Sequence, residues 1–246
     1  GVGGDRLQAQ GATLLAHVRD LAVVGLFEVL SHLPHIRSVF RRVLDEVDRD
    51  RPQAAVLVDY PDFNLRLARA LRRRGIPVVY YVSPQIWAWR KGPIRTIRET
   101  VERMLVIFPF EEALYRDAGV PVEFVGHPLV DLVHPEGRED FLRGLGVSPE
   151  TDVVAVLPGS RPKEIAHNLP GLAGAIGILR AWRPELEFLL PLAPSIEPSA
   201  LQAGLQGLPV RLVPPGGAQS VLASCQAAMV ASGTATVEAA ILGAPM

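Results

Sequence analysis

Short apolar runs alternate along the chain with stretches in which apolar positions recur every three or four residues. The apolar runs lie at 54–59, 77–83, 103–108, 122–126, 152–157, 186–192, 210–213 and 228–231. The helical patterns cover 63–74, 110–118, 162–182, 197–206, 218–225 and the segment from Thr234 onward. This alternation predicts an α/β protein with parallel sheets, because parallel strands need a crossover, usually a helix, to connect them. The run at 54–59 is apolar at nearly every position, which is typical of a strand buried on both faces.

Residues 132–150 interrupt the alternation with a segment rich in Gly, Pro and charged residues. We interpret this segment as a linker or exposed crossover between two Rossmann-like domains, 1–131 and 151–246. Two such domains predict a cleft between them, with ligands at the carboxyl ends of the strands. The chain opens on a glycine-rich turn with no strand before it and closes on a helix stop with no strand after it. We therefore expect a fragment of a longer enzyme, with both domains incomplete.

The segment at 26–47 carries apolar residues at three- and four-residue steps. Pro34 is expected to divide it into two helices, because proline is tolerated in the first turn of a helix and not in its interior. One interpretation is a helical pair that packs on the sheet. The other is that the first part has more apolar surface than the sheet can cover, and enters a lipid interface or holds an acyl chain. The residues concerned are Leu26, Phe27, Val29, Leu30, Leu33 and Ile36.

Composition narrows the class of protein without indicating a function. The chain has 246 residues, of which 48% are hydrophobic, and a formal net charge of −1, which speaks against disorder and against general nucleic-acid binding. Its single cysteine, Cys225, excludes an internal disulfide framework and fits a reducing compartment. We expect neither a transmembrane span nor a signal peptide.

The stretch at 227–243 predicts a short strand, a tight turn and a helix. A Ser or Thr at the start of the helix would cap its N–H groups, and Gly233 would let a ligand approach the backbone. With the helix dipole, these groups form a candidate anion site made of Ser232, Gly233, Thr234, Ala235 and Thr236. Glu238 follows one turn later and could accept hydrogen bonds from sugar hydroxyls. Many α/β proteins have such a turn with nothing bound, so both interpretations stay open.

A second turn of the same kind follows the strand at 152–157. Gly159 permits close approach of the backbone, Ser160 can bond an oxyanion, and Arg161 can bind a diphosphate through two N–H groups. If the two strands are neighbours in the sheet, both turns share one crevice at its edge. That coincidence favours a phosphate site over two unoccupied turns.

Two carboxylates lie near the end of the strand at 54–59. Asp59 ends this strand at the predicted cleft, where its carboxylate could act as a general base toward a hydroxyl. Asp62 stands just before a predicted helix, and we interpret it as an N-cap.

Aromatic and basic residues follow the later strands of the first domain. Trp87, Trp89 and Arg90 lie in a loop after the strand at 77–83. They could stack on a sugar and pair with a phosphate, or the tryptophans could fill the space between helix and sheet. His127 follows the strand at 122–126 and is either structural or part of the cleft.

Several common catalytic, phosphate-binding and metal-binding motifs are absent from this sequence. It contains no nucleophile elbow of the Gly-x-Ser-x-Gly form, no phosphate loop ending in Gly-Lys-Ser/Thr and no His/Cys cluster with metal spacing. We therefore expect no metal and no cofactor. Arg side chains and helix dipoles would then stabilise the charge of a leaving group.

The ordered set of these segments resembles the lipid-A-disaccharide synthases, which are bacterial inverting glycosyltransferases of the GT-B fold. The most specific segments read Asp-Tyr-Pro-Asp-Phe-Asn at 59–64, Tyr-Val-Ser-Pro-Gln-Ile-Trp-Ala-Trp-Arg at 81–90 and Leu-Pro-Gly-Ser-Arg at 157–161. Further matching segments lie at 3–9, 24–30, 108–111, 124–129 and 231–235. Single segments of this kind are common, but their order and spacing over nearly the whole chain are specific.

The resemblance implies a reaction that joins two acylated glucosamines. UDP-2,3-diacylglucosamine would donate its sugar to the 6-hydroxyl of 2,3-diacylglucosamine 1-phosphate, giving a β-1,6-linked disaccharide phosphate and UDP. Asp59 would be the base, the turns at 159–161 and 232–236 would hold the UDP diphosphate, and Glu238, as in related UDP-sugar transferases, would bind the ribose. The acylated substrates favour the lipid interpretation of 26–36 and a peripheral location at the cytoplasmic face of the inner membrane.

The resemblance also implies parts that this chain lacks. The first strand of the family, with its Gly-Glu-x-Ser-Gly-Asp loop, would precede Gly1, and the end of the second domain would follow Met246. Family members exchange C-terminal segments within a homodimer, and without that segment the sequence leaves the oligomeric state open.

Two other functions stay open from the sequence. One is another GT-B-like UDP-sugar enzyme, such as a peptidoglycan N-acetylglucosaminyltransferase or a UDP-sugar 2-epimerase. Such an enzyme would need neither the apolar face at 26–36 nor the tryptophan loop. The other is a UDP-binding or membrane-docking fragment without catalytic activity.

Overall fold

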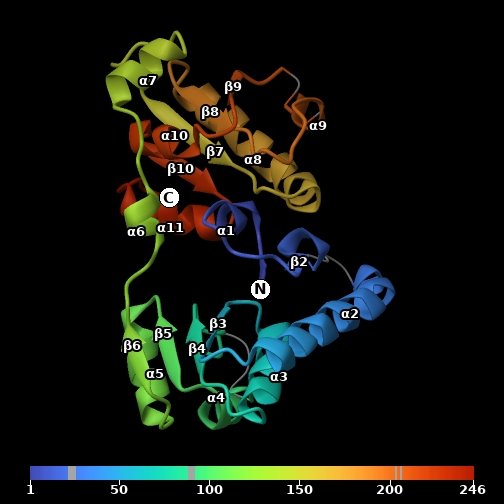
Figure 1. The fold of residues 1–246 in the computed structure, drawn as a ribbon. Coiled ribbons are helices and arrows are strands. Elements are labelled where there is room, and N and C mark those ends of the chain that lie inside the picture. The colour runs from blue at the N-terminus through green and yellow to red at the C-terminus, as the bar shows by residue number, and fades with distance from the viewer. Residues whose placement is uncertain (22–25, 88–91, 203, 206) are drawn as a thin grey trace. The chain divides into compact units, whose positions relative to one another are not determined.

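A computed structural model of the chain describes residues 1–21, 26–87, 92–202, 204–205 and 207–246; the side chains of 26–32, 200 and 202 lie outside this description. The chain forms two compact units, Gly1–His127 and Pro128–Met246. Each unit is built on a four-stranded parallel sheet with helices (Figure 1). The α/β class predicted from the alternating apolar runs is confirmed.

The sheet of the first unit has the strand order β3-β4-β5-β6. Its strands are β3 (Ala55–Val58), β4 (Val78–Tyr81), β5 (Arg103–Val106) and β6 (Val122–Phe124), and the helices α3 (Pro61–Arg72), α4 (Ile94–Thr100) and α5 (Pro109–Asp117) connect them. The chain begins with the short strands β1 (Val2–Gly3) and β2 (Ala16–His17), which pair in parallel, and the short helices α1 (Asp5–Ala9) and η1 (Val18–Asp20). Because β3 to β6 are parallel, their carboxyl ends all lie at one edge of the sheet.

Strand β3 is less buried than the run at 54–59 predicted. Leu57 is buried, whereas Val56 and Val58 are 66% and 52% exposed. Successive side chains of a strand point to opposite faces, and β3 is the edge strand of its sheet. Only the face that carries Leu57 contributes to the core, so the prediction of a strand buried on both faces is wrong.

The segment at 26–47 forms part of one helix, α2 (Leu26–Asp50), with Pro34 inside it. The expected division into two helices at Pro34 is therefore wrong. Proline removes one helical hydrogen bond, and packing of the following turns on the core offsets that loss. The ring of Phe40 meets that of Phe63 of α3 edge-on at 5.5 Å, and Ile36, Val43, Leu44 and Val47 also pack against this core.

The predicted lipid-facing residues of α2 fall only partly within the described side chains. Leu33 and Ile36 are half-buried. The side chains of Leu26, Phe27, Val29 and Leu30 lie outside the description. Among the described residues, no helix combines the length and the apolar character needed to cross a membrane.

The sheet of the second unit has the strand order β10-β7-β8-β9. Its strands are β7 (Val153–Leu157), β8 (Glu187–Pro191), β9 (Val210–Val213) and β10 (Ala227–Val230), and its helices are α6 (Leu129–Leu132), α7 (Arg138–Gly144), α8 (Pro162–Trp182), α9 (Ser199–Gln202), α10 (Ala218–Ser224) and α11 (Thr234–Ile241). Alternate residues of β7 enter two cores, one shared with α7, α10 and α11 and the other with α8 and α9. All five residues of β7 are buried, as expected for a central parallel strand.

Residues 132–150, expected as a linker or exposed crossover, contain α7. Its residues Phe141 and Leu142 are 7% and 0% exposed and belong to the core of the second unit. Arg138 donates hydrogen bonds to the carbonyls of Pro149 and Thr151 and ties the segment down. An apolar pair within a charged segment thus makes a short amphipathic helix. Along the chain, the first compact unit ends at His127 and the second begins at Pro128.

Candidate functional site

Two turns lie side by side at the carboxyl edge of the second sheet. β7 and β10 are neighbouring parallel strands with Leu157 opposite Val230. The N–H of Ala231 donates to the carbonyl of Leu157 at 2.8 Å. The turn at 158–161 therefore adjoins the turn at 231–233. The fold brings together the two segments for which the sequence predicted a shared crevice.

The first turn is held in a conformation that only glycine accommodates. Gly159 has a φ of +122°, and a Cβ there would lie 2.8 Å from Cβ of Glu164. The side-chain amide of Asn168 donates to the carbonyl of Pro158 at 2.9 Å, and the hydroxyl of Ser195 donates to the carbonyl of Ser160 at 2.9 Å. Side chains from α8 and from the loop after β8 thus fix the turn.

A carboxylate already occupies the groups predicted to bind phosphate. Glu164 accepts the backbone N–H of Ser160 at 3.1 Å and an N–H of Arg161 at 2.7 Å. The hydrogen bond from the Ser160 backbone is the main cause that lowers the pKa of Glu164, and Arg161 adds to it. The turn therefore stabilises negative charge, and a diphosphate would have to displace this carboxylate. The sequence did not single out Glu164, although a Glu three residues after Arg161 at a helix start was the available signal.

The second turn leads into α11 without a side-chain cap. The N-cap of α11 is Gly233, and no side-chain hydrogen bond caps this helix in the part of the chain that the structure describes. The hydroxyl of Thr236 donates to the carbonyl of Gly233 at 2.6 Å. The prediction that a Ser or Thr caps the first N–H groups is therefore wrong, because the hydroxyl acts as a donor. An anion remains a suitable partner for the amides of Thr234 and Ala235.

Glu238 lies one turn into α11 and is half-buried. The amide of Gln219 on α10 donates to its carboxylate at 3.3 Å and to the carbonyl of Leu132 at 3.5 Å. The amide oxygen of Gln219 accepts the backbone N–H of His134 at 3.0 Å. Gln219 thus orients Glu238 beside the second turn. A lone Gln on a short helix gave no signal for this role in the sequence.

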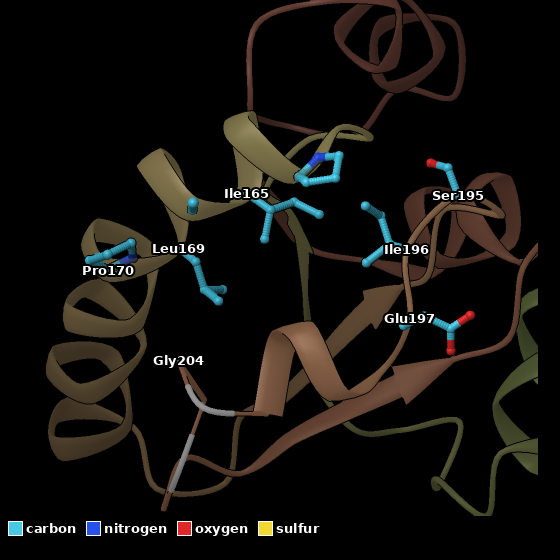
Figure 2. A pocket seen from close by; sticks show the side chains of 9 residues that line it. Ile165, Leu169, Pro170, Ser195, Ile196, Glu197 and Gly204 are labelled. Carbon is cyan, nitrogen blue, oxygen red and sulfur yellow. The ribbon is translucent and has the colours of Figure 1, made fainter.

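A pocket of about 510 Å³ lies beside the first turn (Figure 2). Ile165, Leu169 and Pro170 of α8 face Ser195, Ile196 and Glu197 of the loop after β8, and Pro162, Ala166 and Gly204 complete the lining. Most of this lining is apolar. Through the hydrogen bond from Ser195 to Ser160, the pocket adjoins the turn at 158–161. An apolar part of a ligand bound at the turn could enter it.

In the first unit, the backbone at Asp59 is strained. Asp59 and Tyr60 are consecutive left-handed residues, with φ of 47° and 45°. Such conformations are costly for residues other than glycine and concentrate at functional sites. The hydroxyl of Tyr80 and the side-chain amide of Asn64 both donate to the Asp59 carbonyl, at 2.6 and 2.7 Å. The side chain of Asp59 is exposed at the carboxyl edge of the sheet.

Burial keeps the hydroxyl of Tyr80 a donor. Tyr80 is fully buried, and burial is the main cause that raises its pKa, followed by the charge of Asp59. Asp62 is exposed and lies within the first turn of α3, whose N-cap is Tyr60. The interpretation of Asp62 as the N-cap is wrong, because Pro61 already occupies the first helical position.

The tryptophan loop is described only as far as Trp87, which is 46% exposed. Trp89 and Arg90 lie outside the described residues. His127 follows β6, and its ring lies 5.5 Å from that of Phe108. Asp59, Trp87, Phe108 and His127 therefore follow four successive parallel strands and belong to one edge of the first sheet.

Comparison with solved structures defines the class of the fold. The chain is similar to UDP-GlcNAc 2-epimerase from Neisseria meningitidis bound to UDP-GlcNAc, with a TM-score of 0.64 and 14% identity over 97% of this chain and 69% of that one. It is also similar to MnaA of S. aureus in a co-structure with UDP, with a TM-score of 0.66 and 11% identity over 97% of this chain and 66% of that one. At these identities the likeness establishes the fold alone, which is of the GT-B type.

Sequence comparison defines the family. The family model described as lipid-A-disaccharide synthetase matches residues 1–246. The lipid-A-disaccharide synthase of Koribacter versatilis (strain Ellin345) is 48% identical over 248 residues, which cover 100% of this chain and 64% of that protein. The chain therefore belongs to the lipid-A-disaccharide synthase family, and it spans about 64% of the length of this relative.

Proposed function

We propose that the protein transfers 2,3-diacylglucosamine from UDP-2,3-diacylglucosamine to the 6-hydroxyl of 2,3-diacylglucosamine 1-phosphate. The products are the β-1,6-linked lipid A disaccharide 1-phosphate and UDP. The observation that carries this proposal is the adjacency of the turns at 158–161 and 231–233 in a chain of this family. The backbone N–H of Ser160, once released by Glu164, and those of Thr234 and Ala235 at the start of α11 lie at the ends of these parallel strands, which suits a diphosphate.

The second unit is proposed as the nucleotide-sugar side. Gly159, Ser160 and Arg161 would bind the diphosphate in place of the Glu164 carboxylate. The second turn, consisting of Ser232, Gly233, Thr234, Ala235 and Thr236, would hold it from the neighbouring strand. Glu238 would accept hydrogen bonds from the ribose hydroxyls. The UDP and UDP-GlcNAc bound to proteins of the same fold support a UDP-sugar as the donor.

The first unit is proposed as the acceptor side. The carboxylate of Asp59 would take the proton of the acceptor 6-hydroxyl. At the same time the oxygen of that hydroxyl would form a bond to the anomeric carbon of the donor sugar. The anomeric bond to the diphosphate breaks on the opposite face, so the configuration inverts and the electron pair leaves with UDP. Arg161 and the start of α11 would stabilise the negative charge on UDP. Trp87, Trp89, Arg90 and His127 are proposed to contact the acceptor.

The acylated substrates place the protein at a lipid surface in this proposal. Leu26, Phe27, Val29, Leu30, Leu33 and Ile36 of α2 would contact lipid or acyl chains, which places the protein peripherally on the cytoplasmic face of the inner membrane. A homodimer is part of the proposal by family membership. Light scattering of the purified protein tests the dimer, and sedimentation with vesicles tests the lipid contact.

An assay of purified protein with acylated donor and acceptor tests the function. We expect disaccharide and UDP to form in equal amounts, and we expect non-acylated UDP-glucosamine to be a much poorer donor. Equal turnover of both donors would favour another UDP-sugar enzyme of this fold. Binding of UDP without any transfer would instead favour a protein that only binds the nucleotide.

A further inference from the structure

Glu111 is a buried carboxylate with no part in the mechanism above. It is 1% exposed and lies in the first turn of α5. One oxygen, Oε2, accepts the backbone N–H of Phe108 at 3.1 Å. The other, Oε1, accepts the hydroxyl of Ser83 at 2.6 Å and the indole N–H of Trp87 at 3.3 Å. A carboxylate is costly to bury, and these three donors offset that cost.

A helix cap alone does not explain this arrangement. Capping of α5 requires only the bond from Phe108 to Oε2. Oε1 is bonded to the loop that follows β4, and Ser83 in this loop is 5% exposed. Glu111 therefore ties the loop after β4 to the helix after β5. Both segments belong to the edge of the sheet that carries Asp59, because β3, β4 and β5 are parallel neighbours.

The indole that Glu111 anchors belongs to an aromatic cluster, which consists of Trp87, Phe108, Phe110 and His127. The rings of Trp87 and Phe110 lie 5.2 Å apart at 89°, and those of Phe108 and Phe110 lie 5.6 Å apart at 14°. Trp87 and Phe110 are 46% and 53% exposed. Because its N–H is bonded to a buried carboxylate, the indole of Trp87 is held in one orientation while part of its ring remains accessible.

We propose that Glu111 is a positioning residue that fixes the indole of Trp87, against which Phe110 packs, as a stacking surface for the glucosamine ring of the acceptor. This inference rests on the proposed function. The C–H groups of a pyranose ring carry a slight positive charge, which suits the negative face of an aromatic ring. A ring fixed before binding loses little entropy on binding and orients the sugar. Orientation of the sugar matters because its 6-hydroxyl must reach Asp59, which lies at the same edge of the sheet as Trp87. A surface that only contacted lipid would not need an indole held in one orientation.

Calorimetric titration with a short-chain 2,3-diacylglucosamine 1-phosphate tests this role in the absence of donor. We expect Glu111→Gln to bind this acceptor about tenfold more weakly. One amide oxygen replaces two carboxylate oxygens, and the amide NH2 group must face either the Phe108 N–H or the donors of Ser83 and Trp87, which displaces the loop after β4 from α5. Glu112→Gln is the matched control, since Glu112 is the next residue of α5 and pairs with Arg116 at 2.8 Å. It should bind the acceptor as the wild type does. UDP affinity should be unchanged in both variants. An unchanged UDP affinity shows that the variant is folded, so a loss of acceptor affinity then reports the displacement of Trp87.

Trp87→Phe provides a second variant if Glu111→Gln does not fold. It keeps an aromatic ring but removes the indole N–H, and with it the bond to Glu111, and leaves a smaller ring. Acceptor affinity should therefore fall while UDP affinity stays. Unchanged acceptor affinity in the folded variants would overturn the inference, as would a loss confined to vesicle binding. Transfer is measured separately. If the variants lose acceptor affinity but the wild type forms no disaccharide, the proposed function is contradicted and the stacking surface is supported. Disaccharide formation with unchanged acceptor affinity contradicts the stacking surface alone.

Discussion

The buried hydroxyl of Tyr80 donates a hydrogen bond of 2.6 Å to the backbone carbonyl of Asp59. The bond holds the main chain of the proposed base and leaves its carboxylate at the surface. Asn64 adds a second donor to the same carbonyl at 2.7 Å. Together they stabilise two consecutive left-handed residues that would otherwise relax. The fold thus fixes the backbone from which the Asp59 carboxylate projects, and among the described residues no hydrogen bond or ion pair joins that carboxylate to a neighbouring side chain.

Tyr80→Phe should lower the rate of transfer without changing UDP affinity. The substitution removes one hydroxyl and leaves the Asp59 carbonyl with one donor fewer, so the backbone that carries the carboxylate is held less firmly. We expect kcat to fall about tenfold and the free energy of unfolding to fall by about 1 kcal/mol. Steady-state kinetics and denaturant unfolding measure the two effects. Tyr81→Phe, at the next position of β4, is the control. An unchanged kcat in Tyr80→Phe would show that the hydrogen bond from Tyr80 to the Asp59 carbonyl has no catalytic role.

Asp59→Asn should abolish most of the transfer. The amide retains the size of the carboxylate and cannot accept a proton from the acceptor hydroxyl, so we expect a loss of about a hundredfold or more in kcat. UDP affinity, measured by calorimetry, should not change. Asp62→Asn changes an exposed carboxylate three residues away and should remain active. Comparable turnover of Asp59→Asn and wild type would exclude Asp59 as the base.

Tyr80 and Tyr115 should resist ionisation in alkaline solution. Burial is the main cause that raises the pKa of both phenols above the ordinary value of 10.0. Below pH 10.0 both phenols are neutral in the folded and the unfolded protein, and their contribution to the free energy of unfolding is complete. As the pH rises above 10.0 toward the folded-state pKa, the unfolded state loses its phenol protons first, so this contribution is lost. An ultraviolet absorbance titration measures the ionisation. The absorbance change at the alkaline end of the titration should be smaller in Tyr80→Phe and in Tyr115→Phe than in the wild type. Ionisation of both phenols near pH 10.0 would contradict their burial.

Glu164→Gln should strengthen UDP binding. In the protein without ligand, the Glu164 carboxylate accepts the Ser160 N–H and pairs with Arg161. A diphosphate must displace this carboxylate and also experiences its negative charge. Since Arg161 and Glu164 are both partly exposed, we expect only about a threefold gain in affinity. Glu139→Gln, which disrupts a similar exposed pair with Arg143, should leave UDP affinity unchanged. Weaker UDP binding by Glu164→Gln would mean that the carboxylate orients Arg161 rather than competing with the ligand.

Local patterns in the sequence predicted most elements of the fold. Helix α8 begins and ends where the pattern at 162–182 placed it, and the run at 210–213 coincides with β9. Apolar spacing, Gly and Pro act within a few residues, so the sequence displays their effect directly. The pairing of β7 with β10, which a shared crevice for the two predicted turns requires, is likewise present.

Contacts between distant residues could not be predicted in this way. Tyr80 and Asp59 are 21 positions apart, and Glu111 and Ser83 are 28 apart. Neither bond has a signal in local periodicity, because each depends on which strands become neighbours. Pro34 misled for a related reason, since packing of the following turns on the core keeps α2 continuous. The exposure of Val56 similarly depends on the position of β3 at the edge of its sheet.

The central claim is that the turn at 158–161 binds the diphosphate of UDP, and calorimetric titration of UDP into wild type and Arg161→Ala tests it most directly. Arg161→Ala should lose about 1.5–3 kcal/mol of binding free energy, the range for a hydrogen bond to a charged group. Arg143→Ala, which removes an exposed Arg paired with a carboxylate at 2.9 Å, should bind UDP as the wild type does. Equal UDP affinity in wild type and Arg161→Ala would contradict the proposed donor site.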